Sequence, residues 1–198
     1  MQERPGWEGK ASQSMTTPRL QSNLDFRLMS LLFRLRDWLR PPVRILREAG
    51  VCSGMTVLDF GCGPGSFSLA AAHLVGPEGR VHALDVHPLA LQSVQRAAAK
   101  RGCSNVQTIL GNNMADFGAQ SIDIVLLYDV LHDLSEPAMT LGEIRRVLKP
   151  DGVLSVSDHH LSEEKLLTAI TAGGCFRLTG HGTWTYRFRP MTTNDTVT

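Results

Sequence analysis

The chain has 198 residues, of which 42% are hydrophobic and 20% are charged, which is an ordinary composition for a globular protein. Lys and Arg number 20 and Asp and Glu number 19, so no global charge favours nucleic acid or an acidic membrane. The four cysteines form no C-x-x-C pair, and no apolar run reaches the roughly 18–20 residues that span a bilayer. We therefore expect a cytoplasmic protein with free thiols, without a disulfide framework, zinc ribbon or transmembrane segment.

The N-terminal region is expected to contain one helix. Residues 1–20 are polar and rich in Gly, Pro, Ser and Thr, which predicts a disordered segment. Residues 21–42 carry leucines at three- and four-residue spacing, which predicts an N-terminal helix that is interrupted by Pro41 and Pro42. Its apolar face could pack on the core, or its basic, leucine-rich surface could contact a membrane.

Residues 43–190 alternate between helix and strand patterns and are expected to form the core domain, followed by a disordered tail over 191–198. Strands are expected at 55–61, 80–86, 106–111, 122–129, 153–158, 175–180 and 183–190. Helices are expected at 43–50, 66–75, 88–102, 136–152 and 162–174. This alternation predicts an α/β fold with a doubly wound, mostly parallel sheet, and the final hairpin would add one antiparallel strand.

The stretch "VLDFGCGPG" contains a glycine-rich turn between a strand and a helix. Glycines allow a ligand to approach the backbone closely, and the helix N-terminus offers unpaired N–H groups. Ser66 stands where G-x-G-x-x-G would have its third glycine, so the dinucleotide fingerprint is imperfect. Together with Asp59 in the first strand and Asp85 at the end of the second, the turn predicts a site for a nucleoside-containing ligand.

Five segments resemble class I S-adenosylmethionine-dependent methyltransferases, close to the small-molecule branch of ubiquinone and menaquinone C-methylases: "VLDFGCGPG", "HALDVHP", "ILGNN", "IDIVLLYDVLHDL" and "IRRVLKPDGVLSVSD". The resemblance covers about residues 43–190. It implies a Rossmann-like, seven-stranded sheet in the order 3-2-1-4-5-7-6 with strand 7 antiparallel. An N-terminal helix often covers the carboxyl edge of this fold as a lid, which adds a third interpretation for residues 21–42.

The resemblance also implies a binding site for S-adenosylmethionine, and for its product S-adenosylhomocysteine, along the carboxyl edge of the sheet. The residues expected to form it are Asp59, Gly61, Cys62, Gly63, Gly65, Asp85, Val86, Asn112, Asn113, Met114 and Asp129. The glycine loop would border the methionine part, Asp85 would hold the ribose and Val86 would contact the adenine. Asn112 replaces an acid that usually binds the adenine amino group, and its amide oxygen can still accept that hydrogen bond.

Asn113 and Met114 would flank the adenine ring. Asp129, after the fourth strand, would lie near the methionine amino group.

Three histidines follow the fourth and fifth strands: His132, His159 and His160. They have three interpretations: a metal site, a solvated strand exit, or a contact or general base for the methyl acceptor. No H-x-x-x-H pair is present, and adjacent residues of an extended strand point to opposite sides. We therefore expect no metal site, and His132 and His160 become the leading catalytic candidates, with His159 as the third.

The sequence thus predicts an enzyme that transfers a methyl group from S-adenosylmethionine to a small-molecule acceptor by in-line displacement. The alternatives are a non-catalytic S-adenosylmethionine-binding module or partner subunit, and a nicotinamide-dependent oxidoreductase. The nucleic-acid motif Asn/Asp-Pro-Pro-Tyr is missing, so we expect no nucleic-acid partner. Little chain lies between the fifth and sixth strands, so the acceptor site is open, or is completed by the N-terminal helix or by another chain, as in a homodimer.

Overall fold

The computed structural model describes residues 41–191. The expected disordered segment at 1–20, nearly all of the expected helix at 21–42 and the tail after Met191 lie outside these residues. The helices are α2 (Pro42–Ala49), α3 (Ser66–Val75), α4 (Pro88–Arg101), η1 (Leu131–Asp133), α5 (Pro137–Val147) and α6 (Glu163–Thr171). The strands are β1 (Thr56–Phe60), β2 (Arg80–Asp85), β3 (Val106–Leu110), β4 (Ile122–Tyr128), β5 (Leu148–Ser157), β6 (Phe176–His181) and β7 (Tyr186–Pro190).

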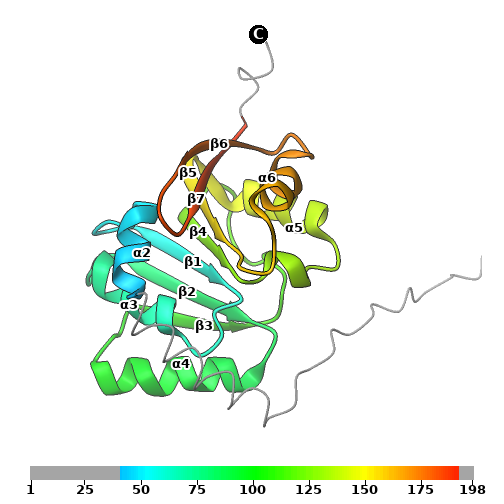
Figure 1. Cartoon of the computed structure of the whole chain (residues 1–198). Coiled ribbons are helices and arrows are strands. Elements are labelled where there is room, and N and C mark those ends of the chain that lie inside the picture. Colours follow the sequence, from blue (N-terminus) through cyan, green and yellow to red (C-terminus); the bar gives the residue numbers. More distant parts are fainter. Residues whose placement is uncertain (1–40, 192–198) are drawn as a thin grey trace, which may run out of the picture.

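The seven strands form one sheet in the order β3-β2-β1-β4-β5-β7-β6, which confirms the predicted fold class. β1 to β5 are parallel, whereas β7 runs antiparallel to both β5 and β6. The helices α2, α3 and α4 cover one face of the sheet, and α5 and α6 cover the other (Figure 1). Consequently the carboxyl ends of β1 to β5 open on a single edge, where open α/β sheets bind ligands.

Apolar side chains on both faces of the central strands hold these layers together. Leu58 of β1 packs towards α5 and α6, whereas Val57 packs towards α2 and α3. Both side chains are 0% exposed, as expected for a parallel strand that is covered on both faces. Within residues 41–191, no helix is long and apolar enough to cross a membrane.

The fifth helix is shorter than the sequence predicted. We expected a helix within 136–152 that is stopped by Pro150, but α5 already ends at Val147 and β5 begins at Leu148. Pro150 has no backbone N–H to donate and disfavours a helical conformation at Lys149. Leu148 instead pairs with Ile122 of β4, and a register shift between Ile122 and Ile124 accommodates the Pro-Asp-Gly segment.

One partly buried contact joins the β6–β7 turn to α2. The Glu48 carboxylate accepts the N–H groups of Thr183, Trp184 and Thr185 at 2.9–3.0 Å, and the Thr185 hydroxyl at 3.1 Å. Burial raises the pKa of Glu48, but these hydrogen bonds outweigh it, and the pKa is lowered overall. The contact therefore favours the ionised form of Glu48 in the folded protein.

We expect Glu48→Ala to lower the free energy of unfolding by about 2–3 kcal/mol, because three backbone donors lose a charged acceptor. Glu78→Ala, at an exposed residue, is the matched control. Because the folded-state pKa of Glu48 is depressed, its contribution is complete above the unfolded pKa of about 4.3 and is lost as pH falls below it. Urea unfolding at pH 7 and near pH 3 measures the loss of stability and its pH dependence. An equal loss of stability in Glu48→Ala and Glu78→Ala would show that the Glu48 contact does not stabilise the fold.

Candidate active site

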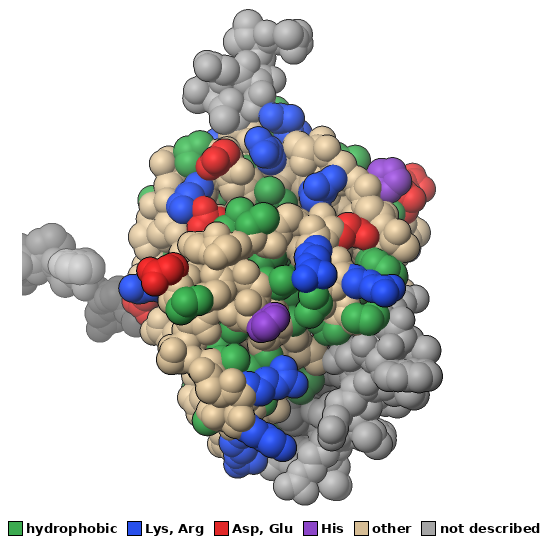
Figure 2. Space-filling model, turned by 90° about the vertical axis from the view of Figure 1, so that its left-hand side faces the viewer, with side chains coloured by type: hydrophobic (Ala, Val, Ile, Leu, Met, Phe, Trp, Pro, Cys, Tyr) green, Lys and Arg blue, Asp and Glu red, His purple; other side chains and the backbone are tan. Residues whose placement is uncertain are grey.

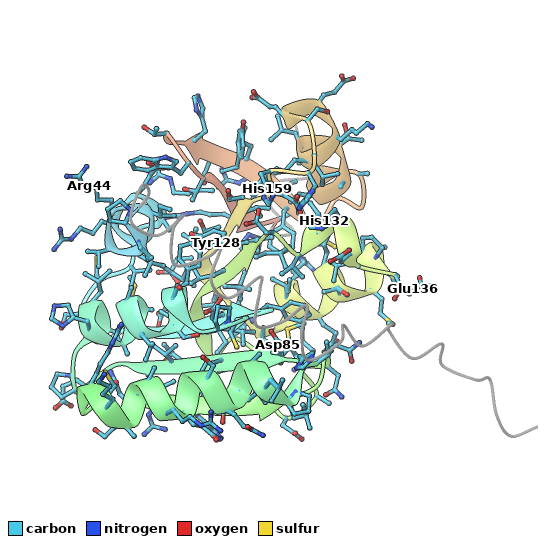
Figure 3. All side chains as sticks on the ribbon, turned by 60° about the horizontal axis from the view of Figure 1, so that its bottom comes forward. Arg44, Asp85, Tyr128, His132, Glu136 and His159 are labelled. Atoms are coloured by element: carbon cyan, nitrogen blue, oxygen red, sulfur yellow. The ribbon has the colours of Figure 1, made fainter. Side chains whose placement is uncertain are left out.

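The carboxyl edge of the sheet brings together most of the residues expected to bind a ligand. β1 leads into the glycine loop, β2 ends at Asp85, and Asp129 follows β4. β5 ends at Ser157, and Asp158 and two histidines come next. Figure 3 shows His132 and His159 beside each other, with Asp85 further along this edge. The site is therefore built by residues at the ends of four parallel strands, β1, β2, β4 and β5.

The glycine loop is folded against β2 by backbone hydrogen bonds. The N–H groups of Gly61 and Cys62 donate to the Leu84 carbonyl at 2.8 and 3.0 Å. Gly61 has a φ of 77°, and a Cβ there would collide with the Val130 side chain. The loop thus requires glycine both for its left-handed backbone and for its contact with the segment after β4.

Substituting Gly61 tests this packing. Gly61→Ala is expected to lower the melting temperature, because the new methyl group is strained by the positive φ and displaces Val130. Gly142→Ala is the matched control, since Gly142 lies within α5 and a Cβ there meets nothing within 4 Å. That control should instead stabilise the protein by about 0.4–1 kcal/mol. Equal thermal shifts in both variants would show that the loop is not constrained in this way.

Two other loop features concern side chains. Asp59, 2% exposed, accepts a 2.5 Å hydrogen bond from the Ser68 hydroxyl of α3 and so ties β1 to that helix. Cys62 is buried against Ala83, Leu91 and Val94. Burial, together with the nearby carboxylates of Asp59 and Asp85, raises the pKa of the Cys62 thiol. Cys62 is therefore a packing residue rather than a nucleophile.

Asp85 is held at the tip of β2 by the chain around it. Its Oδ2 accepts the Gly63 N–H and its Oδ1 accepts the His87 N–H, both at 2.8 Å. Each carboxylate oxygen has a further lone pair, so Asp85 can still accept two hydroxyl groups of a ligand. The adjacent Val86 is 41% exposed, which gives this edge an apolar surface beside the acid.

The segment after β3 is less uniform than the sequence suggested. Asn112 and Asn113 are exposed, and the Asn113 side chain accepts the Ala115 N–H at 3.3 Å. Met114 is only 1% exposed, and its side chain packs in the core cluster with Leu58 and Leu84. The Met114 side chain thus belongs to the apolar core, and a contact of Met114 with a bound ring stays a prediction.

Asp129 occupies an unusual backbone position. Its φ is 54°, a left-handed conformation that only one other non-glycine residue, Gln120, adopts within residues 41–191. The Asp129 N–H donates to the Ser157 carbonyl at 2.7 Å, while its Oδ1 lies 2.7 Å from His159 Nδ1. Such strain is retained where surrounding contacts fix it, often at functional sites. Asp129 thereby links the exits of β4 and β5.

The three histidines form one stack. The His132 and His160 ring centroids are 4.1 Å apart, and those of His160 and His159 are 3.9 Å apart. The argument that His159 and His160 point to opposite sides was wrong, because β5 ends at Ser157 and both residues lie in a turn. The turn brings their two rings into contact at an interplanar angle of 40°.

Asp158 holds two of the three histidines, His132 and His160, in place. Its side chain is 0% exposed and accepts the N–H groups of His132 and His160 at 3.1 and 3.0 Å. His132 Nδ1 lies 2.8 Å from Asp158 Oδ2, which fixes the orientation of the ring. Burial raises the pKa of Asp158, but the hydrogen bonds from His132 and His160 outweigh it and leave the pKa lowered. Among the described residues, no group of three or more potential ligands is arranged to hold a metal ion.

Comparison with known proteins identifies the family to which this chain belongs. A family model described as "Methyltransferase domain" matches residues 52–191. The chain belongs to this methyltransferase family. A solved structure, an S-adenosylmethionine-dependent methyltransferase from Aquifex aeolicus, is 27% identical with a TM-score of 0.69 and covers 79% of this chain and 92% of that one. The fold of residues 41–191 is thus that of the class I S-adenosylmethionine-dependent methyltransferases.

Two sequence relatives carry more specific names. The demethylmenaquinone methyltransferase of Geobacillus stearothermophilus is 32% identical over 126 residues, which are 63% of this chain and 54% of that protein. The demethylmenaquinone methyltransferase of Lactococcus lactis is 29% identical over 143 residues, which are 71% of this chain and 56% of that protein. The chain therefore spans about half the length of the relatives it matches.

The methyltransferase fold implies S-adenosylmethionine as the cofactor, and the residues at this edge fit it. Asp85 offers free acceptor positions to a ribose diol, and the loop glycines leave the backbone accessible. Leu110, which was not among the expected site residues, pairs with Asp85 in the β2–β3 register and is 62% exposed. It adds an exposed apolar side chain at the exit of β3, next to Asp85 in the sheet.

Proposed function

We propose that the protein transfers a methyl group from S-adenosylmethionine to a small aromatic acceptor of the quinol or phenol class. The fold and the names of the two relatives support this chemistry. When bound, S-adenosylmethionine supplies a methyl group on a sulfonium centre that is already activated. The chain then has to align the acceptor, exclude water and remove a proton where the acceptor carries one.

The histidine stack is the observation that carries the acceptor class. Three imidazole rings lie in contact beside Asp129, and the His159 side chain is 59% exposed. A stack that is partly open to solvent offers a flat surface on which an aromatic ring can lie. We propose that His132, held by Asp158, accepts the acceptor proton, and that His160 and His159 contact the acceptor ring.

The cofactor side of the site is divided among the strand exits in this proposal. Gly61, Gly63 and Gly65 border the methionine part, with Asp129 near its amino group. Asp85 binds the ribose, and Val86 contacts the adenine with Leu110. Asn112 accepts from the adenine amino group, and Met114 contributes through its backbone.

We also propose that residues 43–190 are the methyltransferase core and that the protein acts in the cytoplasm without a nucleic-acid partner. The near balance of 20 basic and 19 acidic residues supports a small acceptor over a polyanion. A second copy of the chain completes the open acceptor side in this view. Sedimentation of the full chain with and without S-adenosylmethionine measures the oligomeric state.

Two measurements on the full chain test the function. Calorimetry with S-adenosylmethionine and S-adenosylhomocysteine should show binding of both. Labelled methyl transfer to 1,4-naphthohydroquinone, catechol, a thiol and an amine should favour the two aromatic hydroxyl compounds. Binding without transfer to any acceptor would support the non-catalytic module, and the absence of binding would refute both functions.

A further inference from the structure

The β6–β7 hairpin has one apolar and one basic face. Phe176 and Phe188 are 2% and 0% exposed and pack in the cluster that includes α5 and α6. Side chains alternate along a strand, so Arg177, Arg187 and Arg189 project from the opposite face. Arg177 is paired directly with Arg189 across the two strands. Like charges at such a position are destabilising unless something balances them.

These arginines line a cavity of about 580 Å³. Its other walls include the end of α2 at Ala49 and Gly50, and the start of β4 at Asp123 and Ile124. It therefore opens at the amino ends of the parallel strands, opposite the edge that carries Asp85 and Asp158. Small-molecule sites typically occupy about 300–1,000 Å³, so this volume suits a compact ligand.

The charges around the cavity do not cancel within residues 41–191. Two acids line it, but Asp123 is already matched by Lys149, whose Nζ lies 2.6 Å from its Oδ1. Neither Arg187 nor Arg189 forms an ion pair with another described residue, and the buried Nε of Arg187 has no hydrogen-bond partner there. Asp151 is therefore the one lining acid of the described residues that is left beside Arg187 and Arg189. Figure 2, which views the molecule from the α2 side, shows Lys and Arg side chains spread over this face from its upper to its lower end.

We propose that this cavity binds a small, multiply charged anion, such as a phosphate- or pyrophosphate-bearing metabolite. Guanidinium groups match phosphate oxygens in pairs, and a bound dianion would supply the negative charge that Arg187 and Arg189 lack among the described residues. The expected N-terminal helix is an unsuitable occupant, because residues 23–40 carry four arginines and two aspartates. The site is separate from the methyl-transfer edge, so the proposal does not depend on the acceptor.

Sodium pyrophosphate is the probe for this site. Calorimetric titration of the full chain at constant ionic strength should show saturable binding. The double variant Arg187→Gln/Arg189→Gln should weaken it by about tenfold or more, with S-adenosylmethionine affinity unchanged. The control Arg96→Gln/Arg101→Gln makes the same change in net charge on α4, away from the cavity, and should bind pyrophosphate like the unmodified chain.

A second variant tests the proposal independently if the double arginine variant does not fold. Thr179→Glu adds a carboxylate at an exposed position of the cavity wall without removing a buried side chain, and should also abolish pyrophosphate binding. Circular dichroism confirms that each variant is folded. The absence of binding at millimolar pyrophosphate, or equal affinities in the cavity variants and the control, would overturn the proposal.

Discussion

Asp85→Ala is expected to weaken S-adenosylmethionine binding by about 100-fold or more. Two effects combine at this residue. The ribose diol loses a charged acceptor, and the Gly63 and His87 N–H groups lose the carboxylate that holds them at 2.8 Å. Hydrogen bonds to charged groups contribute about 1.5–3 kcal/mol each, and every 1.4 kcal/mol is tenfold in affinity.

Two further variants separate the ribose contact from the loop contact. Asp85→Asn keeps one acceptor oxygen and most of the side-chain volume, so it should bind with intermediate affinity. Asp116→Ala, at an exposed acid after β3, is the control and should bind normally. Calorimetry gives the affinities, and thermal unfolding without ligand reports the loop. Unchanged S-adenosylmethionine affinity in Asp85→Ala would refute the proposed contact between Asp85 and the ribose.

The fold was predictable because the sequence signals for it are local and repeated. Gly50 and Gly102 end α2 and α4 in the left-handed conformation, and Pro88 opens α4, as their positions in the sequence indicated. The boundary between α5 and β5 was missed because the apolar spacing of a helix continues to Leu148. The strand begins at Leu148 because this residue pairs with Ile122 of β4, a contact that the local sequence does not reveal.

The site was predictable as a set of strand exits, but its internal contacts were not. The pattern placed Asp85 and Asp129 at the carboxyl edge, and the structure brings both there. It gave no sign that Asp129 adopts a left-handed backbone or that a turn stacks His159 on His160. Such features depend on contacts between residues about 30 positions apart, which a local pattern does not encode.

His132→Gln is expected to reduce kcat for a hydroxyl-bearing acceptor by about 10²-fold or more, which is typical for the loss of a general base. S-adenosylmethionine affinity should stay unchanged, because His132 contacts Asp158, Asp133 and His160, none of which is proposed to bind the cofactor. His73→Gln, at an exposed residue of α3, is the control. A rise in KM for the acceptor with kcat preserved would instead assign His132 to acceptor contact.

Asp158→Asn tests how His132 is positioned. The variant keeps the side-chain volume but weakens the 2.8 Å contact with Nδ1, so kcat should fall by about tenfold with little change in S-adenosylmethionine affinity. A loss of about 1–3 kcal/mol in stability should accompany it, because a buried amide satisfies the two N–H donors less well. A variant that lost stability but retained full turnover would restrict Asp158 to a structural role.

The pH dependence of turnover distinguishes the acid from the base. The pKa of Asp158 is lowered, so this carboxylate is ionised above its unfolded pKa of about 3.9, and its stabilising effect is lost only as pH falls through the lower folded value. A decline in kcat on acidification between pH 7.5 and 5.5 would therefore not come from protonation of Asp158. If His132 is the base, the decline should disappear in His132→Gln but persist in His159→Gln. Persistence of the decline in His132→Gln would contradict His132 as the base.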